Sequence, residues 1–113
     1  GVGTVLYELC DESGVGIRLD QEDIPVDDAV AGVCGMLGLD PLYLACEGRM
    51  VVIVPQGEED AALEALRSSE NTAGATLIGR VTDTHPGKVV IHTAIGSEAI
   101  LPEPTGELLP RIC

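Results

Sequence analysis

The last thirteen residues, 101–113, place the strongest limit on how this chain can fold, because they suit neither a helix nor a strand. Pro102, Pro104 and Pro110 each lack a backbone donor and have a fixed φ, and Gly106 adds a flexible point. We therefore expect a folded domain over residues 1–100 and a flexible C-terminal tail over residues 101–113. The tail ends in Cys113 and could span roughly 40 Å when extended. An accessible thiol on such an arm is suited to carry a covalently bound group.

Other roles for the terminal thiol are less well supported by the pattern. The four cysteines, Cys10, Cys34, Cys46 and Cys113, include no Cys-x-x-Cys pair and no close histidine, which disfavours a zinc site. The chain opens with no signal peptide and is not dense in cysteine, so we do not expect a disulfide framework. Prenylation of the common type requires residues after the cysteine. An incidental cysteine on a frayed end stays open as the alternative.

Composition limits the class of protein. A length of 113 residues suits one compact domain, and a hydrophobic fraction of 45% without Phe or Trp predicts a core of Val, Ile, Leu and Ala. The formal net charge of −13 disfavours binding to nucleic acid. No apolar run approaches the roughly 20 residues of a membrane span.

Hydrophobic periodicity predicts the order of helices and strands. We expect helices over 2–13, 26–37 and 58–68, and strands over 15–19, 50–54, 76–82 and 88–93, with a short strand or bend over 95–100. In the second helix Val26, Val30, Val33 and Leu37 should face the core, with Cys34 beside them. In the third, Ala62, Leu63 and Leu66 should point inward.

These elements predict an α/β (α+β) fold, in which helices cover a mixed sheet of four or more strands. The run 50–54 is apolar on both faces, so we expect a central strand covered on both sides. A crossover through helix 58–68 would make strands 50–54 and 76–82 parallel. The turn His85-Pro86-Gly87 should join strands 76–82 and 88–93 as an antiparallel hairpin.

Few side chains suggest chemistry. Glu47 lies between an apolar segment and the expected central strand, so it could be a general base or hold a partner lysine. An ordinary loop acid paired with Arg49 or Arg18 is the alternative. His85 should be exposed in its turn, and His92 should be half-exposed on its strand. Cys10, Cys34 and Cys46 lie in apolar surroundings and should be inert core thiols.

Four segments of the chain resemble the C-terminal half of the hydrogenase maturation factor HypE family. The most specific is the ending Pro110-Arg111-Ile112-Cys113. The others, in the family's order, are Thr4–Leu9 with Ser13–Ile17, then Leu37–Ala45, then Glu47-Gly48. Cys46 departs from the pattern, because many relatives have Asn before the Glu-Gly pair. The chain also begins at Gly1 within a helical pattern, which predicts a fragment of a longer protein.

The resemblance implies a PurM-like (aminoimidazole ribonucleotide synthetase) C-terminal domain and a cytoplasmic enzyme. HypF would place a carbamoyl group on Cys113. An ATP-dependent dehydration assisted by Glu47 would then yield a thiocyanate, and the cyano group would pass to iron held by HypC and HypD. ATP and Mg²⁺ would be bound mainly by a missing N-terminal domain, in a homodimeric full-length protein, and the fragment alone should be inactive. The alternatives are a PurM-like synthetase or kinase acting on a free small molecule, and a non-catalytic docking module.

Overall fold

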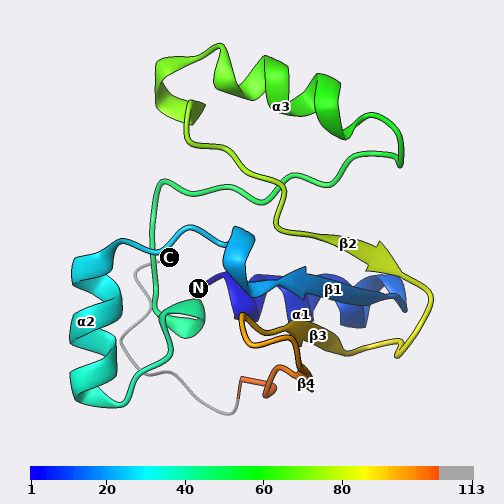
Figure 1. Cartoon of the computed structure of the whole chain (residues 1–113). Coiled ribbons are helices and arrows are strands. Elements are labelled where there is room, and N and C mark those ends of the chain that lie inside the picture. Colours follow the sequence, from blue (N-terminus) through cyan, green and yellow to red (C-terminus); the bar gives the residue numbers. More distant parts are fainter. Residues whose placement is uncertain (105–113) are drawn as a thin grey trace.

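The computed structural model describes residues 1–104, so the predicted carrier Cys113 lies outside the described residues. The helices are α1 (Val2–Ser13), α2 (Asp28–Leu37) and α3 (Glu59–Arg67), and the strands are β1 (Gly16–Asp20), β2 (Gly79–Thr82), β3 (Val89–His92) and β4 (Glu98–Ile100). Three short 3-10 turns are η1 (Gln21–Asp23), η2 (Pro41–Tyr43) and η3 (Glu70–Thr72). Figure 1 shows these elements along the chain.

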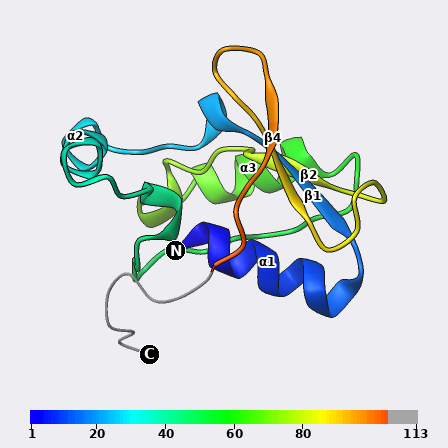
Figure 2. The same cartoon turned by 90° about the horizontal axis from the view of Figure 1, so that it is seen from below.

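The strands form one mixed sheet in the order β2-β1-β3-β4. Strand β1 pairs with β2 antiparallel and with β3 parallel, and β3 pairs with β4 antiparallel. Helix α1 lies along one face of this sheet, as Figure 2 shows from below. The predicted fold class, a mixed sheet of four strands with helices, is confirmed.

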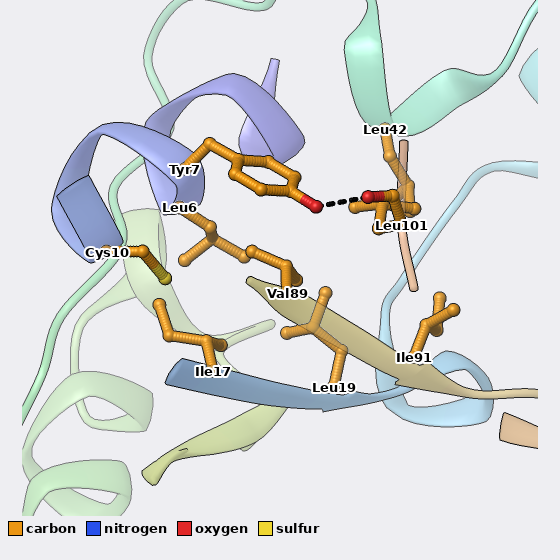
Figure 3. Close-up of a cluster of buried hydrophobic side chains, with 9 residues drawn as sticks. All are labelled: Leu6, Tyr7, Cys10, Ile17, Leu19, Leu42, Val89, Ile91 and Leu101. Atoms are coloured by element: carbon orange, nitrogen blue, oxygen red, sulfur yellow. Dashed lines mark hydrogen bonds between the residues drawn. The ribbon is translucent and has the colours of Figure 1, made fainter. Parts of the chain in front are cut away.

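The core lies between α1 and this face of the sheet. Its members are Leu6, Tyr7, Cys10, Ile17, Leu19, Leu42, Val89, Ile91 and Leu101 (Figure 3). The predicted faces of β1 and β3 are correct, since Ile17, Leu19, Val89 and Ile91 are all buried. Full burial of one such aliphatic side chain contributes about 1.5–3 kcal/mol.

The predicted central strand 50–54 is wrong for this chain. Met50, Val51, Val52 and Ile53 are between 37% and 77% exposed, and within residues 1–104 no strand pairs with them. The proposed parallel pairing with strand 76–82 is therefore wrong as well. An apolar run shows that a segment needs cover on both sides, but it does not show that the cover lies nearby in the same sequence.

The predicted hairpin of strands 76–82 and 88–93 is also wrong, because β1 lies between β2 and β3. The loop that follows β2 crosses the start of β1 instead of turning back along β2. Two backbone hydrogen bonds fix this crossing, from Gly87 N to Val15 O at 2.9 Å and from Ile17 N to Lys88 O at 3.1 Å. The turn residues were placed correctly, but a turn does not decide which strands pair.

Helix α2 differs from the prediction in its burial. Val26, Val30, Val33 and Leu37, which were expected in the core, are exposed, and only Cys34 of this helix is buried. In α3 the predicted inner face is half-buried at most. Figure 1 shows both helices standing apart from the sheet. The apolar period of a helix identifies the face that needs cover and not the segment that covers it.

Candidate functional site

The two catalytic residues predicted from the sequence do not form a site within the described part of the chain. Cys113 lies beyond it. Glu47 lies on an exposed loop between η2 and the apolar run 50–53, next to Gly48, whose φ is 73°. Its expected place at the mouth of a buried strand is wrong, because residues 50–54 form no strand.

The structure does define the root of the C-terminal arm, which we take as Leu101, Pro102 and Glu103. The side chain of Leu101 is 4% exposed and belongs to the core cluster. Its N–H donates to Val89 O at 2.8 Å, which continues the contact with β3 beyond the end of β4. Its carbonyl accepts a hydrogen bond from the hydroxyl of Tyr7 on α1, drawn as a dashed line in Figure 3.

The next two residues of the arm root are held from other directions. The carbonyl of Pro102 accepts a hydrogen bond from the hydroxyl of Tyr43, at the end of η2. The carboxylate of Glu103 forms an ion pair with Lys88, with Nζ to Oε1 at 2.7 Å. Three consecutive residues are thus held by side chains from three separate parts of the fold.

Local sequence places Tyr43 beside the arm root. Asp40 caps η2, because its Oδ1 accepts a hydrogen bond from Leu42 N at 2.9 Å, and Pro41 begins the turn with a fixed φ. The turn packs against the start of α1, where a Cβ at Gly3 would lie 3.0 Å from the Tyr43 ring. A larger residue than glycine at this point would push the ring away from the arm.

Both tyrosines are hydrogen-bond donors over the whole neutral range. Burial raises the pKa of Tyr43 to about 12, and the nearby Tyr7 and Asp40 add to the effect. Burial is also the main cause of the raised pKa of Tyr7. The hydrogen bond to Glu103 raises the pKa of Lys88, so its ammonium stays charged beside that carboxylate.

Sequence reasoning missed this anchoring of the arm. Tyr7 was part of a predicted helix and Tyr43 part of an irregular segment, and neither was assigned a role. A usable signal was present: these are the two tyrosines of a chain that has no Phe or Trp. Tyrosines in a small core usually place their hydroxyl on a specific polar partner.

The remaining candidate residues of the described chain are three cysteines and two histidines. Cys10 and Cys34 are buried as predicted, and burial raises the pKa of Cys10, but Cys46 is exposed, so its assignment as a core thiol is wrong. His85 is exposed at φ 50°, and His92 is half-exposed with Nδ1 3.7 Å from Asp20 Oδ1, both as predicted.

Over residues 1–104 no group of three or more His, Cys, Asp or Glu side chains could hold a metal ion. No helix in the same part of the chain has the length and apolar character to cross a membrane.

The chain is similar to known proteins along its whole length. Residues 1–92 match the family described as AIR synthase related protein, C-terminal domain. Carbamoyl dehydratase HypE of Rhodobacter capsulatus is 44% identical over 113 residues, which are 100% of this chain and 33% of that protein. The chain therefore spans about one third of the length of this curated relative.

Solved structures agree with the sequence comparison. A chain of the HypE–HypF complex matches 92% of this chain and 33% of its own length, with 40% identity and a TM-score of 0.86. A hydrogenase maturation protein HypE in complex with ATP matches 100% of this chain and 35% of its own length, with 37% identity and a TM-score of 0.88.

Proposed function

Because the chain belongs to the family of AIR synthase related proteins, C-terminal domain, and is similar along its whole length to HypE, we propose that it is the C-terminal part of a HypE-type carbamoyl dehydratase. The observation that carries the proposal is the 44% identity to a carbamoyl dehydratase over all 113 residues, up to and including the terminal cysteine. In this proposal residues 1–100 are a PurM C-terminal-like domain and residues 101–113 are the arm that carries the substrate.

The proposed reaction begins on the sulfur of Cys113. HypF transfers a carbamoyl group to the thiolate and forms an S-carbamoyl cysteine. The carbamoyl oxygen then takes the terminal phosphoryl group of ATP, which turns a poor leaving group into a good one. Loss of the phosphate with both N–H protons leaves a thiocyanate, together with ADP, phosphate and a proton. The oxygen removed from the carbamoyl group leaves in the phosphate, so the cysteine adduct loses the equivalent of one water.

We assign Glu47 the role of base for the N–H protons. Its position on an exposed loop supports this, since a group carried on Cys113 requires a base that is accessible from outside the domain core. We place the ATP and Mg²⁺ sites mainly in the upstream part of the full-length protein.

The partners in this proposal are HypF as carbamoyl donor and a HypC–HypD complex as acceptor of the cyano group, with a homodimeric full-length protein. The solved complex of a similar HypE with HypF supports the first of these. Size-exclusion chromatography with light scattering on the full-length protein, alone and with each partner, should give a homodimer and a stable complex with HypF.

Intact-mass spectrometry tests the reaction directly. The full-length protein, incubated with HypF, carbamoyl phosphate and ATP, should gain one carbamoyl group on Cys113 and then lose water. A Cys113→Ser variant should show neither change. Turnover of a diffusible substrate that persists after deletion of residues 111–113 would instead favour a synthetase of the PurM type and contradict the proposal.

A Glu47→Gln variant tests the proposed base. It should accept the carbamoyl group at the wild-type rate and fail to lose water, because the amide is close in shape to the carboxylate but cannot take up a proton. Dehydration at the wild-type rate would remove Glu47 from the mechanism.

A further inference from the structure

The arm root is held by groups that differ in strength. The Lys88–Glu103 ion pair is exposed on both sides, and such pairs contribute little. The Leu101 side chain is buried, but burial of one side chain fixes a position and not the direction in which the chain leaves. The two tyrosine hydroxyls instead hold two successive carbonyls, those of Leu101 and Pro102, from α1 and from η2. Two bonds to adjacent peptide units from different elements fix both position and direction.

We propose that Tyr7 and Tyr43 are positioning residues that set the pivot of the cysteine-bearing arm at Pro104. The proposal rests on the proposed function, because it concerns how the substrate on Cys113 is delivered. Neither tyrosine touches the reacting group in this scheme. They act through the arm, by holding its first residues on the domain while the rest carries the substrate.

The pivot determines how many residues lie between the held part of the chain and Cys113. With the root held, this tether runs from Pro104 to Cys113, ten residues that span at most roughly 35 Å when extended. Without the two tyrosine hydroxyls Leu101 stays held by its buried side chain and by the bond from its N–H to Val89 O, so the tether to Cys113 would begin at Pro102 and have twelve residues. The effective concentration of a tethered group falls roughly as the −3/2 power of the tether length, so the longer tether presents its cargo at about three quarters of the concentration.

A double variant, Tyr7→Phe with Tyr43→Phe, removes both hydroxyls and keeps both rings. A matched control is Thr76→Val, which removes another hydroxyl that donates to a carbonyl, that of Asp23, at 3.0 Å and away from the arm. Both variants are made in the full-length protein. Two quantities are measured: hydrogen exchange of the Leu101 amide, and the single-turnover rate of water loss from protein already carbamoylated on Cys113.

In the double variant the Leu101 amide should exchange about three- to tenfold faster, because the carbonyls of Leu101 and Pro102 lose the tyrosine hydroxyls that donate to them. The rate of dehydration should fall by about one quarter. Deletion of residues 105–106 in the same variant should restore that rate, since it returns the tether to ten residues. Thr76→Val should change neither quantity.

Two results would overturn the proposal. One is an unchanged dehydration rate in the double variant, and the other is a reduced rate that the deletion does not restore, which would indicate a purely structural loss. Failure of the proposed function is distinguishable from both, because the wild-type protein itself would then show no carbamoylation. In that case the exchange of the Leu101 amide would still report whether the tyrosines hold the arm root.

Discussion

Replacement of Gly16 by alanine should destabilise the sheet, because the loop that crosses the start of β1 lies against this residue. A Cβ at Gly16 would lie 2.1 Å from the carbonyl oxygen of Thr84, and ordinary contacts begin near 3.4 Å. The loop would have to retreat by more than an ångström, which breaks the two backbone hydrogen bonds that hold it to β1. Two such bonds contribute about 1–3 kcal/mol together, and crowding a packed site costs a similar amount. We expect a local loss of about 2 kcal/mol or more.

Hydrogen exchange in the full-length protein measures this loss locally. The amides of Ile17 and Gly87, which donate across the crossing, should exchange about 30-fold faster in Gly16→Ala, the equivalent of about 2 kcal/mol. Gly35→Ala is the matched control. Gly35 lies within α2 and nothing lies within 4 Å of its added Cβ, so the change should stabilise the helix by about 0.5–1 kcal/mol. Wild-type exchange at Ile17 and Gly87 in Gly16→Ala would refute the close crossing.

Three further predictions concern the core, the tyrosines and the thiols. Leu19→Ala should reduce the free energy of unfolding by about 2–5 kcal/mol in denaturant titration, since this side chain is 1% exposed on the central strand, and a loss below 1 kcal/mol would contradict its place in the core. Burial raises the pKa of Tyr43 in the folded state from 10.0 to about 12, so the contribution of its neutral hydroxyl to stability is complete below pH 10 and is lost as the pH rises toward 12. The free energy of unfolding should fall by at most about 2–3 kcal/mol over that window, and Tyr43→Phe should make this fall with pH less steep. Cys46 should react with a maleimide within the dead time of manual mixing while Cys10 and Cys34 react only on unfolding, and equal rates for the three thiols would contradict their burial.

Elements whose signal is complete within their own sequence could be predicted. Helix α1 has apolar residues at helical spacing and ends at Gly14, which adopts the left-handed conformation with φ 66°. Strands β1 and β3 alternate, so the buried positions could be assigned before the structure was known. These features depend on residues a few positions apart, which a single sequence displays directly.

Pairings between distant segments could not be predicted. The turn His85-Pro86-Gly87 favoured a hairpin of neighbouring strands, but β1 pairs with both strands and lies between them. Residues 50–54 have the composition of a central strand, but residues 50–53 remain exposed, because the described part of the chain offers them no pairing strand. Local patterns identify what each segment requires, and the contacts that satisfy it depend on the whole fold.

The residues of the candidate site also divide into those that the local sequence could identify and those that it could not. Cys113 was singled out by its place at the end of a proline-rich tail and Glu47 by its place before an apolar run, and the roles that a family resemblance implies for them stay predictions. Tyr7 and Tyr43 were missed because their partners, Leu101 and Pro102, lie 94 and 59 residues away in the sequence. No local pattern connects a helix near one end of a chain to a carbonyl near the other.

The attachment of Leu101 also decides where mechanical tension enters the domain. A pull on the chain beyond Glu103 acts first on the exposed ion pair of Glu103 with Lys88, which yields easily. The pull then reaches Leu101, whose backbone is bonded to Val89 in the interior of the sheet. Leu101 directly follows the edge strand β4, so the force divides between the covalent path into β4, the hydrogen bond to β3 and, through Tyr7, helix α1. The bonds of Leu101 to β3 and α1 therefore reduce the force that would peel β4 from the sheet.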